Sequence, residues 1–258
     1  MAITTEQIKE LRDNTGVAVM QCKKALEEAE GNMEKALMIL KKKSGDIAAK
    51  KAEREAKDGI IVIQKNGKKA VVAIVNCETD FVAKNSDFVA LANTITAKAL
   101  ADGIDATVAG VADMINPVVQ KIGENIQLGK IEMIEGENIG TYVHNGKAGV
   151  AVALSGGGEE LARDIAMHIA AMKPEYISRD QVSTEKVAMA EELYGKEVNA
   201  SDKPEEIKKK MLQGKIDTYF KEVTLLDQAF IKNPEMTIAT LLKNAGDIKV
   251  TSMVREVI

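Results

Sequence analysis

The sequence offers few residue combinations that could carry out a chemical reaction. His144 and His168 are its two histidines, and histidine is the side chain that most often titrates near neutral pH or binds zinc. Neither lies in an HExxH motif or in another metal-ligand spacing. The run Ser155-Gly156-Gly157-Gly158 lies between an expected strand and an expected helix, as phosphate loops do, but no Gly-Lys-Ser/Thr follows it. A turn into a capped helix accounts for these glycines, so the residues predict no enzyme active site, metal or cofactor.

A different kind of candidate is a side chain that enters a binding partner. Thr79-Asp80-Phe81-Val82 follows the apolar run from Ala70 to Val75 and precedes a helical pattern that begins near Phe88. This position predicts a loop at the end of a strand, where binding residues are often found. In a chain with 3% aromatic residues and no tryptophan, Phe81 either packs into the protein's own core or inserts into a partner. The residues leave both alternatives open.

The composition favours a globular protein whose partner is another protein. The chain has 258 residues, 45% of them hydrophobic and 29% charged, which suits about two domains. A net charge of −4 and a pI of 5.5 argue against nucleic-acid binding, which needs a basic surface. Two separate cysteines, Cys22 and Cys77, favour a reducing cytoplasm over a disulfide framework. Because the chain shows no signal-peptide pattern and no run of about 18 apolar residues, we expect a cytoplasmic protein without membrane contact.

The first elements of the chain predict a small three-helix bundle. Thr4 and Gln7 form a capping box for a first helix. A second helix runs from about Val19 to Ala29, with Met20 expected on its apolar side, and Asn32 caps a third. A domain this small and separate from the main core is more often a docking unit than a purely structural one.

The segment from Lys41 to Asp58 carries seven basic and four acidic residues and almost no large apolar ones. This mixture predicts a solvated linker, for which helix is one compatible conformation. A basic run could contact RNA, but the interspersed acidic residues favour the linker.

The following region repeats one order of elements. The first copy has strands at Ile60–Gln64 and Ala70–Cys77 around the turn Asn66-Gly67, and the second has strands at Ile139–His144 and Ala148–Ser155 around Asn145-Gly146. Each hairpin is followed by a helical pattern. The turns are 79 residues apart and the helices 74, so the first copy carries about five more residues before its helix. Those residues include Thr79-Asp80-Phe81-Val82.

The remaining segments complete the predicted fold. Val111 to Ile122 predicts a helix interrupted by Pro117, Ile126 to Glu135 another strand, and Ile248 to Ile258 a closing strand. Val182 to Tyr194 and the segment from Pro204 towards Phe220 predict an antiparallel helical hairpin. We therefore expect an α+β fold with these units: bundle and linker 1–57, first core subdomain 58–140, second core subdomain 141–181 with 222–258, and hairpin 182–221.

Several motifs of this chain resemble those of bacterial translation elongation factor Ts, the family of guanine-nucleotide exchange factors of elongation factor Tu. They are Asn76-Cys77-Glu78-Thr79-Asp80-Phe81-Val82-Ala83-Lys84-Asn85, Leu11-Arg12-Asp13-Asn14-Thr15-Gly16-Val17, Cys22-Lys23-Lys24-Ala25-Leu26, Lys121-Ile122-Gly123-Glu124-Asn125-Ile126 and Lys173-Pro174-Glu175-Tyr176-Ile177. The resemblance implies a ubiquitin-associated-like amino-terminal bundle, a duplicated core and a protruding coiled coil that mediates self-association. It also implies binding to elongation factor Tu without a cofactor of the chain's own and without enzymatic activity.

The resemblance further implies roles for individual residues. Thr79, Asp80, Phe81 and Val82 would disturb the magnesium site of elongation factor Tu and so promote release of GDP. The implied contacts of the amino-terminal bundle with the GTPase domain are Leu11, Arg12, Val17 and Met20. His144 of the second core copy would meet a distant domain of the same partner. His168 would do so as well if it is an interface contact, although its place in a helical pattern also suits a structural residue.

Overall fold

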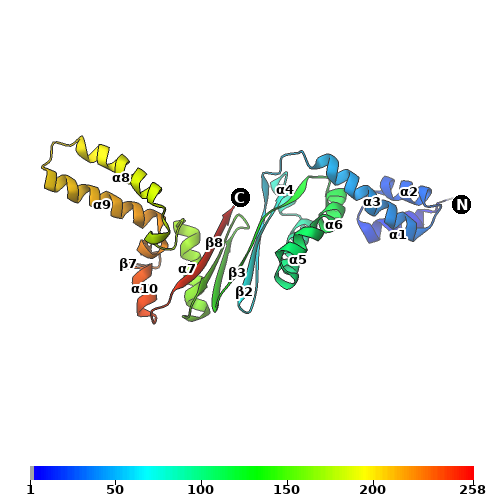
Figure 1. The fold of residues 1–258 in the computed structure, drawn as a ribbon. Helices are drawn as coiled ribbons and strands as arrows, with labels where there is room; N and C mark the ends of the chain where they lie inside the picture. Colours follow the sequence, from blue (N-terminus) through cyan, green and yellow to red (C-terminus); the bar gives the residue numbers. More distant parts are fainter. Residues whose placement is uncertain (1–2) are drawn as a thin grey trace.

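The computed structural model describes residues 3–258, which form an elongated molecule with a helical element at each end. Figure 1 shows the amino-terminal helices at one end, the sheets with their covering helices in the middle, and a long helical hairpin at the other end. The α+β class predicted from the sequence is confirmed. Within residues 3–258 no helix is long and apolar enough to cross a membrane.

The amino-terminal bundle consists of α1 (Thr5–Thr15), α2 (Val19–Glu28) and α3 (Met33–Lys51). The predicted capping box is confirmed, because Thr4 and Gln7 each accept a hydrogen bond from the other's backbone N–H. The prediction for Met20 is wrong, since its side chain is 61% exposed. Met20 lies two positions before the buried Cys22, and this spacing places them on opposite sides of the helix.

The helix α3 replaces most of the predicted linker. It continues to Lys51 because Ile47 and Ala48 pack against the apolar cluster of the first sheet instead of facing solvent. Residues 52–57 alone separate it from the first strand. The bundle is therefore attached to the core through a packed helix.

The first half of the core is an antiparallel sheet of β1 (Asp58–Asn66), β2 (Lys69–Cys77) and β3 (Ile126–Glu135), in that order. Between β2 and β3 lie α4 (Asp80–Ala83), α5 (Ser86–Asp102) and α6 (Ile104–Ile122). The predicted interruption at Pro117 is wrong, because α6 continues through it. Proline removes one N–H donor, and the buried Ile115 and Val119 on either side keep the helix packed on α5 and the sheet.

The second half repeats this arrangement with β4 (Asn138–His144), β5 (Ala148–Leu154) and β8 (Val250–Val257), in the order β4-β5-β8. The helix α7 (Gly158–Met172) covers its outer face, and α10 (Ile238–Asn244) contributes Ile238 and Leu242 to the same apolar cluster. Eight residues, 78–85, separate the second strand of the first copy from its long helix, whereas three, 155–157, do so in the second. The predicted difference of five residues is confirmed, and α4 lies within the longer connection.

The two sheets pack face to face over an apolar layer. Its residues from the first sheet include Ile61, Val72 and Ile74, and those from the second include Ala151 and Ala153. Gly149 lies where the two sheets approach each other closely, because a Cβ atom there would be 2.5 Å from Cγ2 of Ile61. The core is therefore a four-layer sandwich with helices on both outer faces (Figure 1).

The helical hairpin is inserted between α7 and β8. Its helices are α8 (Thr184–Asn199) and α9 (Glu205–Val223), with Pro204 at the N-cap of α9. The short elements around it are η1 (Arg179–Gln181), η2 (Leu225–Asp227), β6 (Ala229–Phe230) and β7 (Asn233–Thr237). At its base Arg179 binds Asp217 at 2.9 Å and Asp227 at 2.7 Å. These ion pairs connect the start of the insertion to its end.

Candidate functional site

The segment Thr79-Asp80-Phe81-Val82 forms one helical turn and not the loop that the sequence predicted. The hydroxyl of Thr79 accepts from the backbone N–H of Val82 at 3.4 Å, and the Thr79 carbonyl accepts from the N–H of Ala83 at 3.1 Å. Threonine is a favourable N-cap, and an acidic residue such as Asp80 stabilises the first turn that follows. The local sequence therefore encodes α4.

The turn divides its side chains between core and solvent. Val82 and Ala83 belong to the apolar cluster of the first sheet, whereas Phe81 is 82% exposed. Of the two alternatives left open by the sequence, packing of Phe81 into the protein's own core is thus excluded for the free protein. A single exposed phenylalanine on a turn anchored by its neighbours is an arrangement suited to insertion into a partner.

Glu124 holds this turn from a distant part of the chain. One carboxylate oxygen accepts from the backbone N–H groups of Glu78 and Thr79, both at 3.1 Å, and the other accepts from the Thr79 hydroxyl at 2.7 Å. Three donors on one carboxylate restrain the backbone ahead of α4, because hydrogen bonds to a charged acceptor are stronger than those between neutral groups. The position of Phe81 therefore depends on Glu124.

A second layer of contacts supports this carboxylate. Glu78 accepts from the backbone N–H of Asn125 at 2.6 Å, and the Asn125 side chain donates to the carbonyl of Arg54 at 2.6 Å. Sequence reasoning assigned no role to Glu78, Glu124 or Asn125. The available signal was the motif from Lys121 to Ile126, whose acidic and amide residues reach the turn only in the folded chain.

An ion pair lies beside the turn, and a buried thiol lies beneath it. Asp80 and Lys84 form an exposed ion pair at 2.8 Å, and the hydrogen bond from Lys84 to Asp80 raises the pKa of Lys84. Beneath the turn, burial raises the pKa of the Cys77 thiol to about 11, with Asp58 and Glu124 adding to the effect. Cys77 therefore stays protonated near neutral pH and donates to the Thr79 carbonyl at 3.1 Å.

His144 lies beside a cavity of about 610 Å³ in the second half of the core. We call this cavity the His144 groove; its apolar walls include Tyr142, Met167, Ala170, Ile231 and Val257, and its cationic residues are Lys173, Lys232 and Arg255. His144 is exposed and its Nδ1 lies 3.0 Å from the Tyr142 hydroxyl. The groove offers apolar surface bordered by positive charge.

His168, predicted as a contact of the same subdomain, is a core residue. Its side chain is fully buried, its Nε2 lies 2.9 Å from Oε1 of Gln228, and its Nδ1 accepts from the backbone N–H of Ile231 at 3.2 Å. Burial lowers its pKa, although the contact with Gln228 partly opposes this effect. The expectation that His168 touches a partner is corrected, because helix α7 directs the ring inward.

The predicted contact residues of the amino-terminal bundle also include both buried and exposed side chains. Leu11 and Val17 lie in the bundle's own core, whereas Arg12 and Met20 are exposed. Leu11 and Val17 are thus corrected to structural residues, since their burial leaves no side-chain surface for a partner. Val19 is also exposed, at 44%, and extends the apolar surface around Met20.

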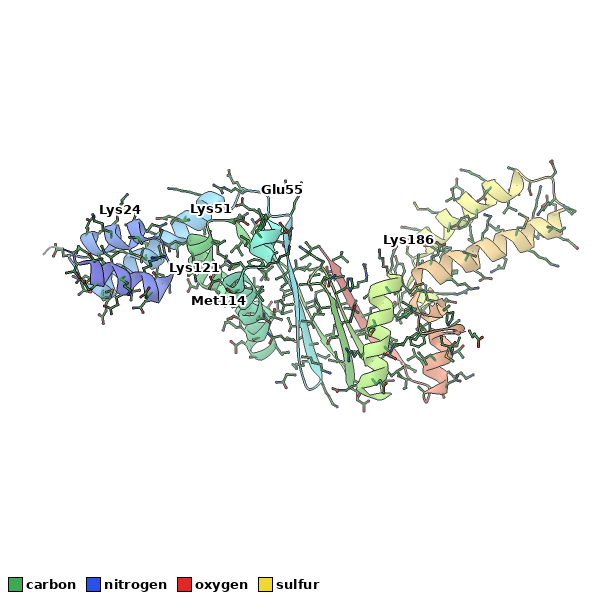
Figure 2. All side chains as sticks on the ribbon, turned by 180° about the vertical axis from the view of Figure 1, so that it is seen from behind. Lys24, Lys51, Glu55, Met114, Lys121 and Lys186 are labelled. Atoms are coloured by element: carbon green, nitrogen blue, oxygen red, sulfur yellow. The ribbon has the colours of Figure 1, made fainter. Side chains whose placement is uncertain are left out.

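The bundle meets the core close to the motif that carries Glu124. Figure 2 shows Lys51 and Lys121 at this junction. The Lys51 ammonium donates to the Gly123 carbonyl, and Lys121 forms an ion pair with Asp87 at 2.8 Å. The segment that supports α4 thus also receives contacts from α3.

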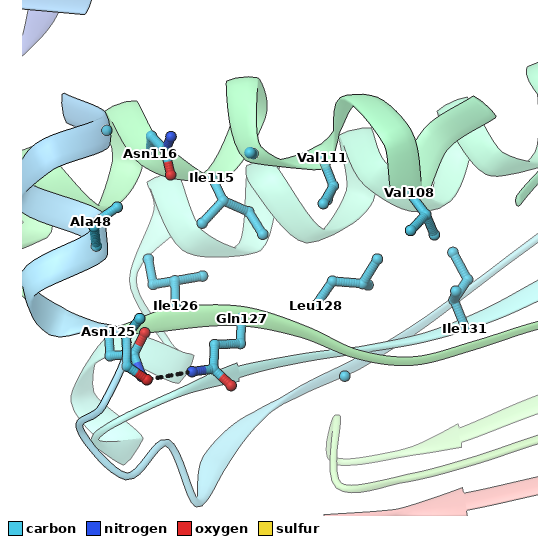
Figure 3. Close-up of a pocket in the computed structure, with 15 residues that line it drawn as sticks. Ala48, Val108, Val111, Ile115, Asn116, Asn125, Ile126, Gln127, Leu128 and Ile131 are labelled. Atoms are coloured by element: carbon cyan, nitrogen blue, oxygen red, sulfur yellow. Dashed lines mark hydrogen bonds between the residues drawn. The ribbon is translucent and has the colours of Figure 1, made fainter. Parts of the chain in front are cut away.

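A second groove of about 610 Å³ runs between α3, α6 and β3. Figure 3 shows the side chains of Val111, Ile115 and Leu128 pointing into it, and the hydrogen bond from Gln127 to the carbonyl of Ala52 at one end. The residues that line it are mainly apolar and small.

In the part of the chain that the structure describes, no group of three His, Cys, Asp or Glu side chains is arranged to hold a metal ion.

The fold is α+β, and its candidate site presents the exposed side chain of Phe81 on a turn that hydrogen bonds hold in place. Residues 78–258 match the family described as Elongation factor TS. The chain is 44% identical to the elongation factor Ts of Hahella chejuensis, over 98% of this chain and 91% of that protein. It is also 44% identical to that of Hydrogenovibrio crunogenus, over 99% and 91%, and 43% identical to that of Psychromonas ingrahamii, over 99% and 90%.

The chain therefore belongs to the elongation factor Ts family, and the resemblance found in its motifs is confirmed. This membership assigns it to the elongation factors of protein biosynthesis.

Proposed function

We propose that this protein is a cytoplasmic guanine-nucleotide exchange factor that binds elongation factor Tu in its GDP form and promotes release of GDP, so that GTP can rebind. Membership of the elongation factor Ts family supports the partner and the role. The single observation that carries the mechanism is the 82% exposure of Phe81 on a turn that Glu124 holds in place. In this role the protein changes the rate of release and catalyses no covalent reaction.

The proposed mechanism acts on the magnesium site of the partner. Phe81 inserts between helices of the partner's GTPase domain, and Asp80 with its neighbours displaces the helix that helps to hold Mg²⁺. Without its counter-ion the GDP phosphates lose electrostatic stabilisation, and the nucleotide dissociates faster. A turn that is already ordered favours insertion, because little conformational entropy is lost on binding.

Two further surfaces complete the proposed interface. The exposed Arg12 and Met20 of the bundle dock on the GTPase domain, and the His144 groove contacts a distant domain of elongation factor Tu. The helical hairpin 182–221 projects from the core, and exposed apolar residues such as Met189 and Leu193 support a role in self-association. We expect the hairpin to contribute little to exchange itself.

A nucleotide-release assay tests this proposal. Purified elongation factor Tu is loaded with a fluorescent GDP analogue, and its release into excess unlabelled GDP is followed with increasing substoichiometric amounts of the chain. We expect the release rate to rise with the amount of chain. A hydrolase would instead consume nucleotide without the partner, and a scaffold would bind the partner without changing release. Binding with an unchanged release rate would refute the proposal.

A further inference from the structure

The hairpin turn that follows His144 is attached to the first sheet. The carbonyl of Gly146 accepts from the backbone N–H of Ile61 at 2.8 Å, and the Lys147 ammonium donates to the carbonyl of Gly59 at 3.0 Å. Lys147 also forms an ion pair with Asp58. These contacts join a turn of the second core half to the first residues of β1.

Asp58 in turn lies beside the strand end that leads into α4. Asp58 faces Cys77 in the pairing of β1 with β2, and the side chain of Asn76 donates to the Asp58 carbonyl at 3.2 Å. Cys77 donates to the carbonyl of Thr79, the N-cap of α4. A short series of contacts thus connects the turn beside the His144 groove with the turn that carries Phe81.

We infer that Lys147 and Asp58 are a positioning pair, which fixes the His144 groove relative to Phe81 so that both engage one partner molecule at the same time. This inference rests on the proposed exchange function. When two contacts belong to one rigid body, the second forms at high effective concentration, and that advantage falls when their relative geometry loosens. The pair therefore acts through Phe81 and His144 and not by touching the reacting nucleotide.

The exposure of the pair separates a positioning role from a stabilising one. The side chains of Lys147 and Asp58 are 40% and 27% exposed, and ion pairs of this kind contribute little to folding stability. The Lys147 hydrogen bond holds the pKa of Asp58 below its ordinary value of 3.8, so Asp58 is charged near neutral pH. Loss of the pair is expected to change geometry with little effect on the melting temperature.

The chain offers a matched control. Lys65 and Glu159 form an ion pair at 2.8 Å that also connects the two halves of the core, between β1 and α7. This pair borders neither α4 nor the turn after His144. Lys65→Met should therefore leave both the geometry and the exchange rate close to those of the unsubstituted protein.

The first test measures geometry in the full-length chain. Spin labels are placed at Ser86→Cys, next to α4, and at Met172→Cys, near the His144 groove, while the native Cys22 and Cys77 are buried. Double electron–electron resonance measures the distribution of distances between the two labels. We expect Lys147→Met to broaden or shift this distribution, and Lys147→Arg and Lys65→Met to retain it. An unchanged distribution in Lys147→Met overturns the inference.

The second test measures coupling in the exchange assay. We expect Lys147→Met to raise the KM for elongation factor Tu with GDP by about three- to tenfold, a partial loss of the effective concentration, with a smaller change in kcat and recovery in Lys147→Arg. The effect of His144→Ala on KM should shrink in the Lys147→Met background, because contacts that act together are not additive. Full additivity of the two substitutions overturns the inference. If the unsubstituted chain does not stimulate release, the proposed function fails, and the distance measurement still decides whether the pair sets the geometry.

Discussion

Replacement of Phe81 by alanine separates binding from folding, because the phenylalanine ring lies outside the core. Phe81 is 82% exposed, so its truncation removes almost no packing from the free protein. Phe88, only seven positions along the chain in α5, is fully buried and provides a matched control of the same residue type. The two substitutions are expected to have opposite consequences for stability and exchange.

The magnitudes follow from where each ring is buried. Phe81→Ala should change the free energy of unfolding by no more than about 0.5 kcal/mol, as for most surface substitutions. Phe88→Ala should cost about 3–5 kcal/mol, which is typical of a large aromatic side chain removed from a core. If insertion into elongation factor Tu buries the Phe81 ring, its loss removes about 1.5–3 kcal/mol from the interface. That loss corresponds to a decrease in kcat/KM for GDP release of about 10- to 150-fold.

Thermal unfolding and fluorescent GDP release measure both effects on the same preparations. Phe81→Ala should melt at the temperature of the unsubstituted protein but stimulate GDP release from elongation factor Tu only weakly. Phe88→Ala should melt at a far lower temperature. Because binding of the factor and binding of GDP weaken each other equally, Phe81→Ala should also reduce this mutual weakening. A large fall in melting temperature for Phe81→Ala, together with unaltered exchange by its folded fraction, would refute the insertion of Phe81.

Three other predictions concern separate parts of the molecule. Glu124→Gln should keep the fold but slow GDP release, because a carboxamide cannot accept all three hydrogen bonds from the start of α4; release equal to that of the unsubstituted protein would contradict this role. His168 has a lowered pKa in the folded state, so the unfolded state binds more protons as the pH falls. The free energy of unfolding should therefore fall as the pH drops below about 6.5, by at most about 1.4 kcal/mol per pH unit. Denaturant titrations at several pH values should show a shallower dependence for His168→Asn than for the unsubstituted protein. Replacement of the hairpin 182–221 by a Gly/Ser loop should alter self-association, which light scattering measures. The exchange rate should stay within about tenfold of that of the unsubstituted protein, a difference of about 1.4 kcal/mol in the barrier. A greater loss would assign the hairpin a role in exchange.

Local signals predicted much of the secondary structure. The two Asn-Gly turns mark hairpins, and the Thr4 capping box and the cap at Asn32 begin helices as expected. These features depend on residues a few positions apart, so the sequence reports them directly. The duplication was visible for the same reason, since both copies use the same turn and similar helical periodicity.

The wrong predictions concern places where packing overrides the local signal. The charged segment after Lys41 resembles a linker, yet α3 continues because α6 and the first sheet cover its apolar residues. Pro117 is a helix breaker by local criteria, but the neighbouring buried residues hold α6 together. The turn α4 is a different case, because its Thr79 cap is a local signal, but one turn is too short for a periodic helical pattern and the contact with Glu124 also holds it.

The amino-acid sequence by itself determined the class of fold and the duplicated order of elements, and it singled out the segment that we propose binds the partner. The tertiary structure alone decided which of the predicted contact residues reach solvent: Phe81 does, whereas Leu11, Val17 and His168 do not. It also decided that Glu124 meets Thr79 across 45 positions and that Lys147 meets Asp58 across 89. The physical reason is that burial and long-range pairing depend on which distant segments pack together, and no local pattern records that choice.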